Sequence, residues 1–315
     1  MKIFICGLIV YVSFHFSFLL LFNSRLSNKI DNEAVINYLL SGGTNNMVGN
    51  RSLESILSFG FINPNNLFRL GLNNMSVGFS SSVFVFSDVD YEETGIMTEY
   101  IHDPNPMRIE APLVYIYNTH QLENFSMENL APYNIKPNVL MASYILREHL
   151  NSLGIPTIVE TADITEILRI NNWAYRFSYQ ASRMLIKDAM EKNPTIEYLI
   201  DLHRDAVPHN ISTAEINGIN HARIMFVVGR EHANYKENLR IATALNDLIV
   251  ADNPTLSRGI MIKEGPGVNG IYNQDLSGNA ILIELGGQFN TIEEVNNTMP
   301  ILARVLFKHI RGEAL

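Results

Sequence analysis

The chain has a single cysteine, Cys6, in 315 residues and no run of basic residues. One cysteine cannot form an intramolecular disulfide, which excludes a disulfide-stabilised secreted scaffold. Lys and Arg number 23 against 32 Asp and Glu, so the formal net charge is −9. Nucleic-acid binding depends on basic patches that neutralise phosphates, and this balance excludes nucleic acid as the main partner. Apolar residues make up 47% of the chain, enough for an ordinary core.

The amino terminus is predicted to be a membrane anchor. Residues 3–22 are 20 consecutive uncharged, mostly apolar positions, a length that spans the roughly 30 Å hydrocarbon core of a bilayer as a helix. A cleaved signal peptide would need a shorter apolar region and an A-x-A-like site, which this segment lacks. We therefore favour an uncleaved anchor over residues 1–27; a cleaved export signal and a buried amino-terminal helix are the alternatives. Lys2 on one side and Arg25 and Lys29 on the other leave its orientation open.

Residues 28–107 are predicted to be a linker with little regular structure. They are rich in asparagine, serine and glycine and carry only short apolar groups. Such a composition makes a poor core and a suitable tether. Pro104 and Pro106 indicate an extended boundary at its end, because proline disfavours helix in the residue before it.

Residues 108–315 are predicted to form an α/β domain with a mostly parallel twisted sheet covered by helices on both faces. Apolar strands alternate with helical periods over this range, which is typical of that class. Strands are expected near residues 114–117, 155–159, 198–203, 222–228 and 280–285. Helices are expected from the Asn138 cap to Gly154, at 175–192, at 235–250, and from the capping box Thr291-Ile-Glu-Glu294 to about 310.

Three of these strands bring chemically active residues to their ends. His203 and His120 each end an apolar run, and Glu123 follows three positions after His120. Two neutral imidazoles and one carboxylate, with a coordination position left open, are a usual ligand set of catalytic zinc. The alternatives without a metal are two ordinary histidines whose hydrogen bonds are satisfied within the protein, and a solvent-exposed loop glutamate at position 123.

Glu284 is the predicted general base. It is embedded in the apolar run Ala280–Leu285, and burial without a partner raises the pKa of a carboxyl group. A carboxylate with a raised pKa is suited to take a proton from the water of a metal site and to pass it to an amine leaving group.

Whole phrases of the sequence resemble one family. They are I-Y-N-T-H-Q-L-E-N-F (116–125), S-Y-Q-A-S-R (178–183), I-D-L-H-R-D-A-V-P (200–208), M-F-V-V-G (225–229), Y-K-E-N-L (235–239), S-R-G-I (257–260), Y-N-Q-D-L-S (272–277) and L-I-E-L-G (282–286). In this order they resemble the stage II sporulation protein P family, from about Ala111 to about Arg311.

The resemblance implies a membrane-anchored peptidoglycan hydrolase related to the zinc N-acetylmuramoyl-L-alanine amidases, with its catalytic domain outside the cytoplasm. It also implies an endopeptidase activity on cross-links, a role in engulfment of the forespore, and the stage II sporulation proteins D and M as partners. In terms of residues, it implies zinc ligation by His120 and His203 and catalysis by Glu284.

One position departs from the family pattern. Asn118 stands where the family phrase has the first histidine of H-T-H. If that histidine binds metal or moves protons, activity is in doubt; if it only hydrogen-bonds the site, asparagine offers similar donors and acceptors. The substrate or the surroundings of the site are further expected to involve Arg204, Asn273 and Gln274. Arg204 can pair with Asp201, Asp205 or a substrate carboxylate, and the other two lie in a loop ahead of the Glu284 strand.

Two rival functions remain open from the sequence. Asn118 motivates a catalytically silent, membrane-tethered scaffold that binds the wall, whereas the other candidate residues argue against it. A zinc peptidase that acts on protein is the second rival, because one mechanism serves both kinds of amide bond.

Overall fold

The computed structural model describes residues 100–128, 130 and 135–312. The membrane segment predicted at residues 3–22 lies outside these ranges, as does the predicted linker up to residue 99. In the part of the chain that is described, none of the helices has the length and apolar character needed to cross a membrane. The anchor therefore stays a prediction.

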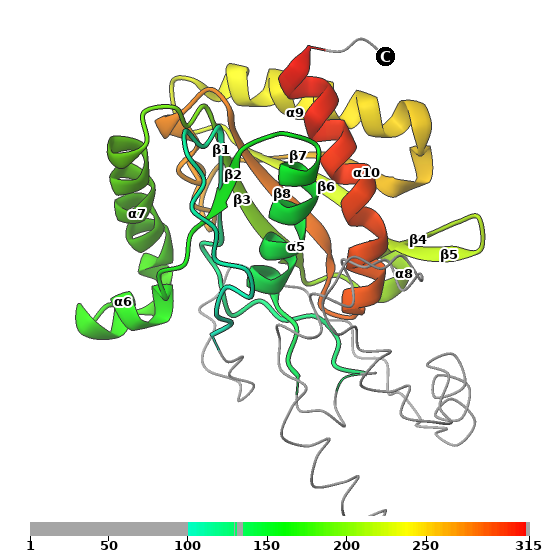
Figure 1. Cartoon of the computed structure of the whole chain (residues 1–315), viewed down its shortest axis with the longest axis horizontal. Coiled ribbons are helices and arrows are strands. Elements are labelled where there is room, and N and C mark those ends of the chain that lie inside the picture. The colour runs from blue at the N-terminus through cyan, green and yellow to red at the C-terminus, as the bar shows by residue number, and fades with distance from the viewer. Residues whose placement is uncertain (1–99, 129, 131–134, 313–315) are drawn as a thin grey trace, which may run out of the picture.

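Six strands form the central sheet: β1 (Val114–Tyr117), β2 (Thr157–Val159), β3 (Tyr198–Asp205), β6 (Ile224–Gly229), β7 (Ser257–Lys263) and β8 (Ala280–Gly287). Their order is β2-β1-β3-β8-β6-β7 (Figure 1). The first four of this order are parallel, β6 is antiparallel to β8, and β7 is parallel to β6. The predicted α/β class with a mostly parallel sheet is confirmed.

Helices cover both faces of the sheet (Figure 1). One face carries α5 (Val139–Ser152), α9 (Tyr235–Asp252) and α10 (Ile292–Arg311), and the other carries α6 (Ile164–Ile170) and α7 (Ser178–Lys192). The remaining elements are short: η2 (Tyr175–Phe177), α8 (His209–Ser212), η3 (Pro254–Leu256), η4 (Gln274–Leu276), and the two-stranded pair of β4 (Thr213–Ile216) and β5 (Ile219–Ala222).

Alternate residues of each strand face opposite helical layers, as the pleat of a strand requires. In β3, Ile200 and Leu202 belong to the large apolar core shared with α5, α9 and α10. Leu199 packs on the other face with Ile186 of α7. Because β3 and β8 are in register, the residues of both strands that share the α7 face also lie next to one another.

Local signals in the sequence account for several helix ends. Asn138 caps α5, because its side chain accepts a hydrogen bond from the backbone N–H of Met141. Gly154 follows the end of this helix with φ of +78°, a conformation that favours glycine. Thr291 and Glu294 form the predicted capping box at the start of α10.

The sequence patterns missed four features of the fold. The β4–β5 hairpin turns at Asn217-Gly218, whose φ values are +52° and +77°; such a pair is typical of a type I′ turn. Helix α6 begins at Asp163, which accepts hydrogen bonds from the two N–H groups of Thr165 and Glu166. The edge strand β7 and the reversed direction of β6 were also not expected.

The first described residues pack against α5. Ile101 is 1% exposed, and its carbonyl accepts a hydrogen bond from the Tyr144 hydroxyl. Arg147 of the same helix forms an ion pair with Asp103. Residues 100–107, which the composition assigns to the linker, thus contact the domain directly.

Candidate metal centre

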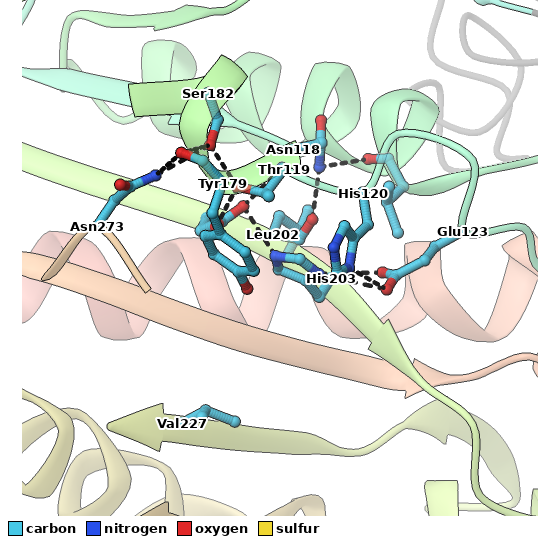
Figure 2. A network of polar contacts seen from close by, with 12 residues as sticks. Asn118, Thr119, His120, Glu123, Tyr179, Ser182, Leu202, His203, Val227 and Asn273 are labelled. Atoms are coloured by element: carbon cyan, nitrogen blue, oxygen red, sulfur yellow. Dashed lines mark hydrogen bonds and ion pairs between the residues drawn. The ribbon is translucent and has the colours of Figure 1, made fainter. Parts of the chain in front are cut away.

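The three predicted metal ligands lie together at one edge of the sheet. His120 and Glu123 follow β1, and His203 belongs to the carboxyl-terminal part of β3. One ligand atom from each lies within 4.8 Å of the other two. The Nδ1 atoms of His120 and His203 are 3.3 Å and 3.2 Å from carboxylate oxygens of Glu123. The glutamate therefore connects the two imidazoles (Figure 2).

A tight turn after β1 brings Glu123 back beside His120. The backbone N–H of Glu123 donates to the carbonyl of His120 at 3.1 Å. Glu123 Oε2 accepts a hydrogen bond from the backbone N–H of Arg204 at 3.0 Å. Phe125, which is fully buried in the core, anchors the chain that follows. The position of this carboxylate is thus fixed by the backbone of β3 and by an apolar anchor.

A series of buried polar groups holds His203 from the opposite side. Asp201 Oδ1 lies 2.9 Å from His203 Nε2. Asp201 accepts from the Thr119 N–H at 2.9 Å, and the Thr119 hydroxyl is 2.7 Å from Asp201 Oδ2 and 2.9 Å from Ser182 Oγ of α7. A carboxylate on the distal nitrogen commonly orients a metal-binding histidine and leaves the other nitrogen for the metal. This geometry leaves His203 Nδ1 facing Glu123.

The electrostatics of the centre favour a positive charge. Burial alone would lower the pKa of His203, but Asp201 and Glu123 raise that pKa well above its usual value. Burial alone would also raise the pKa of Glu123, yet His203 and His120 hold it below its usual value. Two carboxylates that converge on one imidazole are stabilised by a cation, and a divalent metal ion supplies one. The donor set present here therefore fits a metal ion.

Glu284 lies next to this centre on the same face of the sheet. It pairs in register with His203 across β8 and β3. Burial, with a further contribution from the charge of Glu123, raises the pKa of Glu284 to about 8. Its Oε2 atom is buried and has no hydrogen-bond partner among the described residues. A carboxyl group with a pKa near neutrality can take up and release a proton at neutral pH.

Solvent reaches the three ligands from the side of His120. The side chains of His203, Glu123 and His120 are 3%, 16% and 28% exposed. Three potential metal ligands with access on one side leave a coordination position for water or substrate.

Comparison with known proteins gives the family. A family model for Stage II sporulation protein P matches residues 86–307. The chain belongs to the stage II sporulation protein P family. The Stage II sporulation protein P of Bacillus subtilis (strain 168) is 34% identical over 226 residues, which cover 70% of this chain and 56% of that protein. The chain thus spans little more than half the length of this relative.

Two solved structures resemble this member of the family more distantly. An N-acetylmuramoyl-L-alanine amidase from Clostridium difficile 630 has 15% sequence identity and a TM-score of 0.39, over 64% of this chain and 97% of that one. Cwp6 from Clostridium difficile has 13% identity and a TM-score of 0.36, over 62% and 29%.

Asn118, where the family phrase has histidine, faces away from the metal centre. Its side chain is 2% exposed and lies on the α5 face of the sheet (Figure 2). Its amide donates to the carbonyl of Leu202 at 2.6 Å, and its Oδ1 accepts from Ser143 Oγ at 2.9 Å. Asn118 therefore connects β1, β3 and α5, and contacts none of the three ligands.

The other predicted substrate or surrounding residues also form internal hydrogen bonds. Arg204 Nε donates to the carbonyl of Asn124 at 3.0 Å. Asn273 Nδ2 donates to the carbonyl of Tyr179, and Gln274 bridges Val227 and Gly229 of β6 with its amide group. Arg204 contributes to the centre through its backbone N–H, whereas Asn273 and Gln274 hold the loop before β8 in place.

Asp201 went unrecognised in the sequence as a neighbour of the centre. Asp201 precedes His203 by two residues, and that spacing puts both on one face of a strand. Asp201 was considered only as a partner for Arg204, but it contacts His203 instead. Tyr179 packs its ring near both histidines. The sequence indicates the position of Tyr179 less clearly than that of Asp201, because only the packing of α7 on the sheet brings the tyrosine there.

Proposed function

We propose that this chain is a membrane-anchored, zinc-dependent peptidoglycan hydrolase that acts as an N-acetylmuramoyl-L-alanine amidase. One observation carries the proposal: the cluster of His120, Glu123 and His203 lies beside Glu284, a buried carboxyl group with a raised pKa and an unpartnered oxygen. Membership of the stage II sporulation protein P family supports the wall as substrate and sporulation as the setting.

In this proposal, one group of residues binds the zinc ion and another residue transfers protons. His120, Glu123 and His203 would hold the zinc ion, which when bound polarises the scissile carbonyl and lowers the pKa of a water molecule. Asp201 keeps the His203 ring oriented, with Nδ1 toward Glu123. Glu284 takes a proton from the attacking water and passes it to the nitrogen of L-alanine, the leaving group. The lactyl group of N-acetylmuramic acid leaves as a carboxylate.

The setting of this activity is part of the same proposal. The apolar residues 3–22 would anchor the chain in the cell membrane with the catalytic domain on the wall side. Forespore engulfment is the process in which a wall hydrolase of this family would act. The stage II sporulation proteins D and M are the expected partners.

The test is zinc content together with wall cleavage by the full-length chain. We expect one zinc per chain, and mass spectrometry of fragments from purified wall should show free L-alanine amino termini. The double variant His120→Ala, His203→Ala should lose both the zinc and the cleavage. His309→Ala, a histidine of α10 that packs on Tyr198, is the matched control and should keep both. Stoichiometric zinc in the double variant would refute the site.

The same experiment separates the two rivals. A wall-binding scaffold would bind purified wall and release no fragment, whereas a zinc peptidase would cut protein or cross-links and leave the lactyl amide intact. The motive for the scaffold was Asn118, and its place on the α5 face weakens that motive.

A further inference from the structure

Tyr179 stands in the first turn of α7, and its ring packs against both histidines of the metal centre. The ring is nearly parallel to that of His203, with centroids 6.4 Å apart at 16°. It meets the His120 ring edge-on at 5.4 Å and 73°, and the Tyr272 ring at 5.4 Å and 75°. Three aromatic contacts on different sides define one position for this phenol.

The backbone of Tyr179 is held by the same polar network that holds His203. Its carbonyl accepts from Asn273 Nδ2 at 3.0 Å, and Asn273 Nδ2 also donates to Ser182 Oγ at 2.9 Å. Ser182 Oγ in turn lies 2.9 Å from the hydroxyl of Thr119, which contacts Asp201. These hydrogen bonds and the 2.9 Å contact of Asp201 Oδ1 with His203 Nε2 connect the tyrosine to the predicted histidine ligand, so their relative position is fixed before substrate binds.

The phenol hydroxyl is the part of this residue without a structural role. It makes no hydrogen bond with any residue in the described part of the chain, although the side chain is half-buried. The hydroxyl points away from the network that holds the Tyr179 carbonyl (Figure 2). Asp201, Glu123 and Glu284 are close enough for their charges to act on it. An unused donor is therefore carried by a ring that packs on both predicted histidine ligands.

We infer that the Tyr179 hydroxyl is a further catalytic group, which donates a hydrogen bond to the oxygen of the scissile carbonyl as negative charge develops there. The inference rests on the proposed function. In the reaction the oxygen of water bonds to the carbonyl carbon, the carbon–nitrogen bond breaks, and both water protons end on the amine, which leaves as an ammonium group. Tyr179 keeps its own proton throughout, because burial raises the pKa of this phenol well above its usual value and the hydroxyl stays a donor at neutral pH.

Tyr179→Phe in the full-length, zinc-loaded chain tests the inference, because it removes one oxygen and keeps the ring contacts. With a soluble muramoyl-peptide as substrate, we expect kcat to fall about 10²-fold, near the lower end for loss of one oxyanion donor. KM should stay within about threefold, since the bond strengthens only as charge develops. Zinc content and the melting temperature should match the wild type.

Two further measurements distinguish this role from a structural one. A phosphinate analogue of the muramoyl-peptide, which mimics the tetrahedral state, should bind Tyr179→Phe more weakly by a factor similar to the loss in kcat. Tyr117→Phe is the matched control, because it removes another buried phenol from the same face of the sheet; its kcat should stay within about twofold of wild type.

The outcomes separate this inference from the function on which it rests. Cleavage by the wild type with an unchanged kcat in Tyr179→Phe would overturn the inference alone, and so would a rise in KM at constant kcat. A wild-type chain that loads zinc and cleaves no muramoyl amide would overturn the proposed function and this inference with it.

Discussion

The two faces of β3 and β8 differ in what their side chains do. On the α5, α9 and α10 side, Ile200, Leu202 and Ile283 belong to one continuous apolar core and are fully buried. On the α7 side, the next residues along the same strands are Asp201, His203 and Glu284, and the apolar contacts there form smaller, separate clusters. The core face stabilises the strands strongly enough for the opposite face to bury polar groups at the metal centre.

Along these strands, residues that stabilise the fold and residues that serve the chemistry are one position apart. Burial of apolar area on one face favours folding by about 25 cal/mol per Å². A buried carboxyl group on the other face opposes folding. Neighbouring positions of one strand should therefore give opposite patterns when they are changed.

The largest expected effect is on the polar face, at Glu284. Glu284→Gln keeps the shape and removes the base, so turnover should fall by roughly 10²–10⁴, the usual share of general acid–base catalysis. Zinc should remain, and the metal-free chain should be no less stable than wild type, because a neutral amide is easier to bury than a carboxylate. Initial rates of wall cleavage, zinc content and urea unfolding measure the three quantities.

Glu123→Gln is the paired control for that experiment. A metal ligand at 123 predicts loss of zinc first, with activity lost as a consequence. Loss of zinc from Glu284→Gln would make Glu284 a ligand, and near-normal wall cleavage by it would end the proposed mechanism.

The next effect is on the core face, one residue earlier. Ile283→Ala removes a fully buried side chain and should lower the free energy of unfolding by about 2–5 kcal/mol. Because its side chain points away from the centre, kcat per folded molecule and zinc content should match the wild type. Urea unfolding at fixed zinc concentration gives the first value, and the folded fraction corrects the second. A large fall in kcat without loss of stability would contradict the separation of the two faces.

Much of the fold could be read from the sequence because its signals are local. The Asn138 cap, the capping box at Thr291 and the apolar strands depend on neighbours within a few residues, and the structure has them. The direction of β6 could not be read, since an apolar run has the same pattern in either direction. The Asn217-Gly218 pair that joins β4 and β5 is a local signal for a hairpin, and it could have predicted this one.

The meeting of the three predicted ligands followed from topology. The carboxyl ends of parallel neighbours such as β1 and β3 meet at one edge, so His120 and His203 had to approach each other once both strands were paired. The contacts that tune the centre were harder to foresee. The place of Asp201 could have been predicted, because residues two apart in a strand lie on the same face. The place of Tyr179 depends on how α7 packs on the sheet, which no local pattern specifies.

The smallest expected effect tests whether Asn118 belongs to the centre at all. Asn118→Ala leaves the buried carbonyl of Leu202 without the donor at 2.6 Å, and an unsatisfied buried group costs about 1–3 kcal/mol. Stability should fall by that amount while zinc content stays the same, because the side chain lies on the α5 face. Ser143→Ala, which removes the donor to Asn118 Oδ1, should destabilise less, since the bond from the Asn118 amide to the Leu202 carbonyl stays in place.

Asn118→His sharpens the same point, because it restores the residue that the family phrase has at this position. If the asparagine only connects β1, β3 and α5, the imidazole should leave zinc content unchanged, since the three ligands stay where they are. Zinc analysis of the purified variants decides whether the side chain at position 118 belongs to the α5 face or to the metal centre. Loss of zinc from Asn118→Ala, or a second zinc in Asn118→His, would show that position 118 takes part in metal binding. Position 118 would then belong to the metal centre and not to the α5 face, contrary to what the hydrogen bonds of Asn118 indicate.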